Sequence, residues 1–549
     1  MNWRSIGGSQ VAFALAFGLL AAPLGAAELT GWVDLHAHPM SNLAFGGKLV
    51  HGGPDVGSLL PADASCNKNV VAQSMDHALG DDKSTHGGFG FFDNQCGDDL
   101  RKAVIDGIQV ANDALVTPDH ALGSPNFVDW PRHNDITHQK MWVDWIKRAN
   151  AGGLRVMVAL ATNNKTLADS VSGPGDGPSD DKASADKQID AIKAFVARHG
   201  DFLAIAKTPA ELRTIAGAGK TAIVLGVELD ALGNFYRNKS APSQASVAAE
   251  LERLRGKGVR YVLPIHMVDN HFGGTAVYND IFNFSNYREA GSFWTLECAA
   301  ASKKVTFRSQ PGAFDAALGV VKVAKLGMDP FLQPPDPPSC ASGRGHANSR
   351  GLTSLGKFAL TELMRLGMLI DIDHMSQRSA DAALSLAAAV PSGGYPLNSG
   401  HNEFRGDGGS ENSRTPEQLQ QIAQLKGVFG LGLDSTSPQE FIAQYLAIQD
   451  EMGNRGIGFG TDMNGLVKGG RPIKNSVSYT ASFPKSKTGN RTWDYNVDGM
   501  AHYGMLTDFI RALEERSADG KSVVTSLNKS AEFFAQMWER ADQQKARVP

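Results

Sequence analysis

The sequence predicts an α/β protein: a (β/α)8 barrel (TIM barrel) with long loop insertions at the carboxyl ends of its strands. First, short apolar runs alternate with amphipathic helical segments, as parallel strands covered on both faces do. Second, eight such runs are present, which favours a closed barrel over an open sheet. Third, no G-x-G-x-x-G motif follows the first run, so an open dinucleotide-binding sheet lacks its main support.

The predicted elements follow from these patterns in chain order. The first strand is the stretch GWVDLHAHPM at 31–40, and the others lie at 154–162, 221–230, 259–270, 368–374, 395–401, 428–433 and 456–465. Period-3.6 patterns predict helices at 135–153, 246–258, 352–367, 377–389, 415–427, 437–453, 502–516 and 529–541. Pro416 falls in the first turn of its helix, where a missing N–H is harmless.

Two irregular stretches interrupt the alternation, at about 41–130 and 271–350. We interpret them as loop insertions on the carboxyl face of one barrel domain that spans 28–549. A separate domain within 41–130 is the alternative, but this stretch has no core-like periodicity.

Composition restricts the location and the partners of the protein. Its 549 residues carry a formal charge of -4, which gives no electrostatic case for nucleic acid or an anionic membrane. Residues 1–27 combine Arg4, the apolar run VAFALAFGLLAA and small residues, the pattern of a signal peptide. The run is shorter than the roughly 20 residues of a membrane span. We therefore expect an exported protein, periplasmic or secreted, whose mature chain has no membrane span.

The chain has four cysteines: Cys66, Cys96, Cys298 and Cys340. In an oxidising compartment an even number of cysteines usually pairs. Of the possible connectivities we expect nearest neighbours, Cys66 with Cys96 and Cys298 with Cys340. A thiolate zinc site is the competing interpretation, but the chain has no C-x-x-C spacing to support it.

Ionisable residues gather at the ends of the predicted strands, where barrel enzymes place their active sites. Five of the 15 histidines and two carboxylates lie there: His36, His38, Glu228, His266, His374, His401 and Asp462. A single histidine at a strand end is more often structural, so the prediction depends on the ordered set. Residues i and i+2 of a strand point to one side, so the first two imidazoles can share a divalent ion.

This set suits metal chemistry. Neutral imidazoles with a carboxylate favour zinc, although manganese, iron or cobalt are also compatible. The ligands suffice for two ions bridged by Glu228, and a shared water would then ionise near neutral pH. Asp462 would move protons between that water and the leaving group. The alternative for Asp462 is a turn former, because TDMNG has turn composition.

Several stretches resemble the renal or membrane dipeptidase family, peptidase family M19. The most specific is RGLTSLGKFALTELMRLGMLIDIDHMS at 350–376. Shorter likenesses are IVLGVELDALGN, RYVLPIHMVDN, SRTPEQLQQIAQLKGVFGL and GIGFGTDMNG. The resemblance covers roughly 220–465 and the first strand.

The resemblance implies a binuclear zinc site. His36 and His38 would hold one ion, His374 and His401 the other, with Glu228 bridging them. The family usually has His-x-Asp where this chain has His-x-His, and NSGHNE replaces its Ser-His-Ser.

The resemblance also implies roles around the metals. His266 would contact the scissile carbonyl, Arg414 would bind the free carboxylate of the substrate, and Asp462 would protonate the departing amine. Asn464 replaces the second aspartate of the family's last turn. The insertions are expected to reshape the pocket.

Three functions remain in competition. The leading hypothesis is an exported, zinc-dependent, dipeptidase-like hydrolase of small molecules with a free carboxylate. The second is an amidohydrolase acting on a cyclic amide or an N-acyl amino acid. The third is a periplasmic binding protein without catalysis. A homodimer is plausible for any of them.

Overall fold

The computed structural model describes residues 27–47, 49–60, 70–80, 123–128, 130–136, 138–170, 178–310, 333–453 and 455–549. The expected signal peptide, except its last residue, and the expected Cys66–Cys96 pair lie outside these residues. No helix within the described ranges is long and apolar enough to cross a membrane.

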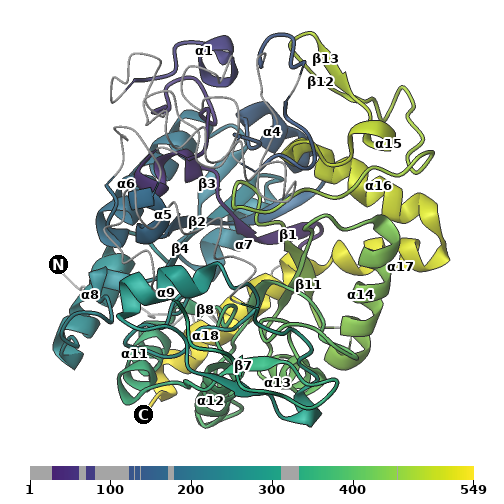
Figure 1. The fold of residues 1–549 in the computed structure, drawn as a ribbon. Helices are drawn as coiled ribbons and strands as arrows, with labels where there is room; N and C mark the ends of the chain where they lie inside the picture. Colours follow the sequence, from purple (N-terminus) through teal and green to yellow (C-terminus); the bar gives the residue numbers. More distant parts are fainter. Residues whose placement is uncertain are drawn as a thin grey trace, which may run out of the picture.

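Eight parallel strands form the centre of the molecule, with helices arranged around them (Figure 1). They are β1 (Trp32–Ala37), β2 (Leu154–Asn163), β4 (Thr221–Leu229), β5 (Tyr261–Leu263), β8 (Leu369–Ile370), β9 (Ser399–Asn402), β10 (Phe429–Gly432) and β11 (Ile457–Gly460). Their order is β8-β5-β4-β2-β1-β11-β10-β9. A parallel bridge between Asp371 and Asn398 joins the two outer members of this series. The predicted α/β barrel is thereby confirmed.

Each of the eight strands overlaps its predicted apolar run, but β5 and β8 are much shorter than the runs at 259–270 and 368–374. The other differences concern the connections. An additional strand, β3 (Leu203–Ile205), pairs with β4. The helix predicted at 135–153 is wrong in its first half, because α4 spans only Val143–Ala151. The backbone N–H of Gln139 instead donates to the carbonyl of His51 at 2.8 Å, so this segment pairs with the first insertion.

The second insertion is more regular than predicted. It contains α9 (Phe282–Ala290) and an antiparallel pair, β6 (Leu296–Cys298) with β7 (His346–Asn348). The Cys298–Cys340 disulfide is present as expected and closes a separation of 42 residues.

Helices surround the barrel, and several of them begin at a capping residue. They are α1 (Met75–Leu79), α4, α5 (Lys165–Ser170), α6 (Asp181–Arg198), α7 (Pro209–Gly217), α8 (Gln244–Gly256), α9, α11 (Ser354–Arg365), α12 (Gln377–Ala388), α13 (Pro416–Gln424), α14 (Pro438–Met452), α15 (Tyr495–Asp498), α16 (Leu506–Arg516), α17 (Ala518–Leu527) and α18 (Ser530–Gln544). Capping boxes start α13 at Thr415 and α14 at Ser437. A hairpin of β12 (Ser486–Thr488) and β13 (Arg491–Trp493) lies between α14 and α15 in the sequence.

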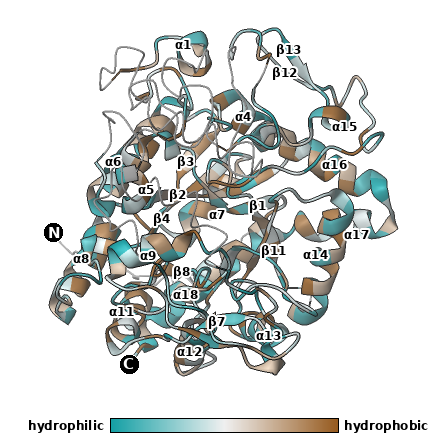
Figure 2. Ribbon diagram, in the orientation of Figure 1, coloured by the Kyte–Doolittle hydropathy of each residue, from teal (hydrophilic) through white to brown (hydrophobic). Residues whose placement is uncertain are grey.

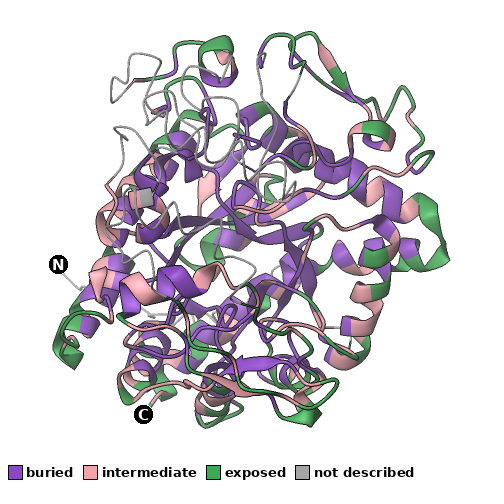
Figure 3. Ribbon diagram, in the orientation of Figure 1, coloured by how far each residue is buried: buried purple, intermediate pink, exposed green. Residues whose placement is uncertain are grey.

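The barrel interior is the hydrophobic core. Apolar residues concentrate on the central strands (Figure 2), and β1, β4 and β11 are buried along their whole lengths (Figure 3). Helix α18 closes the amino end, where the Ser530 hydroxyl accepts the N–H of Val33 at 3.0 Å. The carboxyl ends of the strands therefore form the face that is available for a site.

Candidate metal centre

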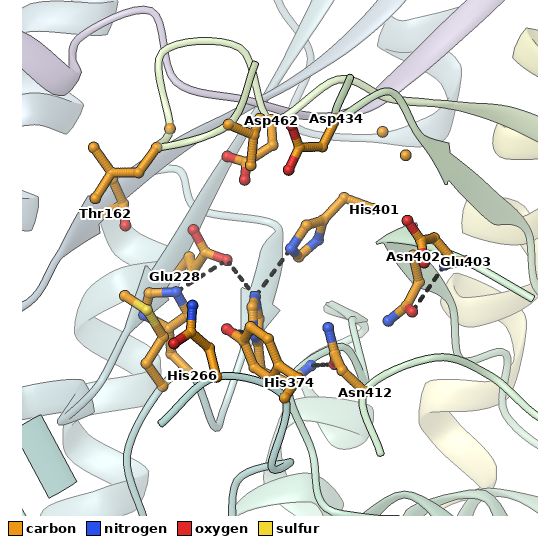
Figure 4. A pocket seen from close by; sticks show the side chains of 18 of the residues that line it. Thr162, Glu228, His266, His374, His401, Asn402, Glu403, Asn412, Asp434 and Asp462 are labelled. Atoms are coloured by element: carbon orange, nitrogen blue, oxygen red, sulfur yellow. Dashed lines mark hydrogen bonds and ion pairs between the residues drawn. The ribbon is translucent and has the colours of Figure 1, made fainter. Parts of the chain in front are cut away.

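Glu228, at the carboxyl end of β4, lies at the centre of a histidine cluster (Figure 4). Its Oε1 is 3.3 Å from Nε2 of His36 and 3.4 Å from Nε2 of both His266 and His374. Its Oε2 is 3.4 Å from Nε2 of His38. Strands far apart in the sequence thus bring four imidazoles to one carboxylate.

Two further predicted residues complete the cluster. Nε2 of His401, in β9, lies 2.9 Å from Nε2 of His374. Oδ1 of Asp462, just after β11, lies 3.0 Å from Nε2 of His38 and 3.8 Å from Nε2 of His36. All seven residues predicted from the strand ends therefore meet in one place.

The donor set fits divalent cations. Two ligands about 2.1 Å from a tetrahedral zinc ion lie about 3.4 Å apart, close to the 3.3 and 3.4 Å separations around Glu228. Nδ1 of His36 is buried without a hydrogen-bond partner among the described residues, and its Nε2 faces Oε1 of Glu228 at 3.3 Å. Four groups at or beside the cluster could each hold an ion: His36, Glu228 and His401; His36, His38 and Asp462; Glu228, His266 and His374; Asp371, Asp373 and His401.

The far nitrogens of four imidazoles are held from outside the cluster. Nδ1 of His38 lies 3.3 Å from the carbonyl of Leu160. The other three contacts are His266 with Asp230 at 3.1 Å, His374 with Tyr278 at 3.0 Å, and His401 with Asp373 at 3.2 Å. Such partners fix ring orientation and tautomer, so each Nε2 faces the centre.

Burial lowers the pKa of two predicted ligands, His36 and His374. Burial acts in the same direction on His38 and His401, but neighbouring carboxylates outweigh it there and raise the pKa of both. Burial, followed by the charge of His401, lowers the pKa of His36 to about 4. Burial also lowers the pKa of His374 to about 4. Both imidazoles are therefore neutral at pH 7, the form that binds metal. Burial opposes protonation of His266 too, but the charges of Glu228 and Asp230 outweigh it and raise its pKa to about 9.

The backbone is strained at two residues of the cluster. His374 and Asp462 have φ angles of 61° and 46°, in the left-handed region that non-glycine residues rarely adopt. Strain of this kind persists where surrounding contacts impose it and gathers at functional sites. The N–H of Gly465 donates to the carbonyl of Asp462 at 2.8 Å. Asp462 therefore forms a turn, as its alternative interpretation proposed, and also faces the cluster.

A cavity of ≈ 380 Å³ opens onto the cluster. This volume suits a small ligand. His38, Glu228, His374, His401 and Asp462 line it together with His266, and Phe45, Tyr278 and Phe282 bring both insertions to its wall. No lysine or arginine of the described ranges lines it.

Arg414 is placed differently from the other predicted residues. Its side chain is fully buried, and its Nε donates to the carbonyl of Asn412 at 3.0 Å. Asn412 and Ser413 line the cavity, and Arg414 does not. The geometry gives no support to a contact between Arg414 and a substrate carboxylate, so that role stays a prediction.

Sequence reasoning missed the groups that hold the far nitrogens: Asp230, Tyr278 and Asp373. Asp230 had a signal, because it follows Glu228 by two positions and so shares its side of the strand. Asp373 directly precedes a predicted ligand. Tyr278 falls in a stretch without periodicity and had no signal in the sequence.

The ring of parallel strands and the cluster at its carboxyl end define an α/β barrel with a candidate metal centre. Residues 338–481 match the family model for membrane dipeptidase, peptidase family M19. The resemblance predicted from sequence is thereby confirmed over this segment, which carries His374, His401 and Asp462. The match supports a metal-dependent, dipeptidase-like hydrolase.

Comparison with curated proteins found no match. Among solved structures, an amidohydrolase from Pseudomonas aeruginosa is 13% identical, with 72% of this chain and 92% of that chain covered and a TM-score of 0.42. A dipeptidase of family M19 is 14% identical, with 72% and 88% covered and a TM-score of 0.43. A metallopeptidase from Rhodobacter sphaeroides, liganded with a phosphinate mimic of L-Ala-D-Ala, is 14% identical, with 81% and 97% covered and a TM-score of 0.43. These scores are too low to carry an argument.

Proposed function

We propose that this protein is a metal-dependent hydrolase that cleaves the amide bond of a dipeptide or a similar small substrate. The single observation that carries the proposal is the convergence of four Nε2 atoms within 3.3–3.4 Å of the Glu228 carboxylate at the base of a cavity. The family match over residues 338–481 supports the same reaction class.

His36, His38, His374 and His401 would hold two divalent cations, with Glu228 between them. The neutral imidazoles and one carboxylate favour zinc. Bound there, the cations would supply a water that ionises near neutral pH and would polarise the amide carbonyl.

The chain's own groups would then orient and protonate the substrate. His266 lies on the cavity wall, where its imidazole can donate to the carbonyl oxygen. Asp462 also lines the cavity and can carry a proton to the departing amine. Its Oδ1 is 3.0 Å from Nε2 of His38, so it is held against the centre.

A second substrate class has a specific observation in its favour. Because no lysine or arginine of the described chain lines the cavity, a free carboxylate has no lysine or arginine partner there. This favours an amide without such a carboxylate, for example a cyclic amide. An N-acyl amino acid would need the same carboxylate contact as a dipeptide.

The test is hydrolysis of three panels by the zinc-loaded protein: L-L and L-D dipeptides, N-acyl amino acids, and cyclic amides. Arg414→Ala is assayed beside the unmodified chain. Dipeptide turnover with a raised KM in Arg414→Ala would support the family role of this arginine. Turnover of cyclic amides alone would favour the second substrate class over dipeptides. No turnover with any panel would contradict the proposal.

We also infer that the protein works in an oxidising compartment. The Cys298–Cys340 disulfide supports this, since cytosolic thiols are kept reduced. Cell fractionation of the native host tests it, and recovery of the full-length chain in the cytosol would contradict export.

A further inference from the structure

Tyr278 is a hydroxyl-bearing residue of the cavity wall, on the loop between β5 and α9. Its ring packs against Phe282 and His374, with centroid separations of 5.1 and 5.7 Å. Its Oη lies 3.0 Å from Nδ1 of His374. Within the described ranges this is the hydroxyl's one hydrogen bond. Its direction therefore decides whether the phenolic hydrogen is free for donation to a substrate.

The direction follows from the position of the imidazole. Nε2 of His374 faces the centre, 3.4 Å from Oε1 of Glu228 and 2.9 Å from Nε2 of His401. If Nε2 is a metal ligand, the single hydrogen of the neutral ring is on Nδ1. Nδ1 then donates to Oη of Tyr278, and the phenolic hydrogen is free to be donated into the cavity.

A second potential donor packs against the same imidazole. The ring of His266 packs edge-on against His374, with centroids 4.7 Å apart, and it also lines the cavity. Tyr278 and His266 thus both pack against His374, a predicted metal ligand, and both line the cavity. A carbonyl oxygen bound in front of His374 would have two potential donors beside it.

We propose that Tyr278 is a catalytic residue that donates a hydrogen bond to the scissile carbonyl oxygen as this oxygen becomes anionic. The inference rests on the proposed hydrolase function and adds a residue that the family resemblance did not supply. A neutral phenol suits the role, because it is protonated at pH 7 and its donor strength increases toward an anionic acceptor. The second insertion would then contribute to the chemistry as well as to the shape of the pocket.

The test is Tyr278→Phe, which keeps the ring and its packing on Phe282. Four quantities are measured on zinc-loaded protein: kcat, KM, bound zinc, and the affinity for a dipeptide phosphinate. The substrate is the amide that the unmodified chain hydrolyses fastest. We expect kcat and phosphinate affinity to fall by about 10- to 100-fold, with KM within about twofold and bound zinc unchanged.

The matched control is Tyr287→Phe. Tyr287 belongs to α9, packs on Phe293 with a centroid separation of 4.6 Å, and does not line the cavity. None of the four quantities should change in this variant.

Three results would overturn the inference alone. They are an unchanged kcat with an unchanged KM, an unchanged kcat with a raised KM, and the loss of a zinc equivalent; the last would mean that the hydroxyl only holds His374. An unmodified, zinc-loaded chain that hydrolyses nothing and binds no phosphinate would overturn the proposed function, and this inference with it.

Discussion

One carboxylate oxygen of Asp373 contacts both the backbone N–H and the ring of His401. Oδ2 of Asp373 accepts the backbone N–H of His401 at 2.7 Å and lies 3.2 Å from its Nδ1. Oδ1 accepts the side-chain amide of Asn402 at 2.7 Å. The aspartate is fully buried, so these contacts fix both the backbone and the ring of His401 from the side away from the cavity.

Replacing Asp373 by Asn should weaken metal binding without unfolding the protein. The amide has nearly the same shape, but it removes the charge behind His401, and such changes typically lower metal affinity by about 10- to 100-fold. Competition with a zinc chelator measures the affinity, and circular dichroism checks the fold. Asp407→Asn is the control, because Asp407 is fully exposed and pairs with Lys304 at a loop. Equal zinc affinity in the two variants would contradict the role of Asp373.

The Asp373 contact also shows how far the sequence could predict the site. Alternating apolar runs locate the strands, and the carboxyl ends of parallel strands share one face, so the residues that converge were predictable. The contact between residues 373 and 401 was not, because it depends on the register of two neighbouring strands. The strand β8 covers only two residues, and the chain turns at His374, so period-two alternation no longer indicates side-chain direction there.

The side-chain direction of Arg414 could not be predicted from the sequence for a related reason. A motif places an arginine at the start of a helix, and this was correct. Whether its side chain enters the cavity depends on the local backbone. Here Nε and Nη2 of Arg414 donate to the carbonyl of Asn412, and the side chain does not line the cavity.

Glu228→Gln should remove both metal equivalents. Four imidazoles contact this carboxylate, and a neutral amide offers one weaker oxygen ligand in place of two charged ones. Elemental analysis after gel filtration measures the bound zinc. Glu403→Gln is the matched control, since Glu403 also lines the cavity but makes no ion pair among the described residues. Two retained equivalents in Glu228→Gln would exclude a bridging role.

Gly430→Ala should disturb the site through the backbone. A Cβ at position 430 in β10 would lie 1.8 Å from the carbonyl oxygen of Gly400, the residue before His401 in β9. The strands must separate, so we expect a loss of about 1–3 kcal/mol in the free energy of unfolding together with weaker zinc binding. Gly217→Ala in α7 meets nothing within 4 Å, and it should stabilise the protein by about 0.5–1 kcal/mol. Unchanged stability and zinc affinity in Gly430→Ala would show that the barrel has room at this point.

Removing the Cys298–Cys340 disulfide by mutation should lower the free energy of unfolding. The disulfide joins residues 42 positions apart. A disulfide across a loop of that size adds about 2–4 kcal/mol to the free energy of unfolding. The double variant Cys298→Ser with Cys340→Ser should shift the urea midpoint downward. Next to this segment, Val305 bridges to Gly409, and the same loop continues to Ser410 and Asn412 on the cavity wall. A raised KM should therefore accompany the shift, and an unchanged urea midpoint would contradict the prediction.

His502, which is not one of the predicted metal ligands, should make the protein sensitive to acid. Its ring is fully buried, stacks on Trp145 with centroids 4.4 Å apart, and lies 3.1 Å from the hydroxyl of Ser486. Burial, followed by the charges of Arg148 and Lys140, lowers the pKa of His502 well below 6.5. Below about pH 6.5 the unfolded chain therefore binds a proton that the folded chain does not.

The sign of the effect follows from this difference. The free energy of unfolding falls as the pH decreases, by at most about 1.4 kcal/mol per pH unit for one histidine. His502→Phe keeps an aromatic ring against Trp145 and removes the titrating group, so its stability should depend less on pH. Urea unfolding of both metal-free proteins between pH 5 and 7.5 measures the difference, because the other titrating groups are common to both. Parallel stability curves over that range would show that His502 takes up a proton in the folded state and would contradict its burial as a neutral ring.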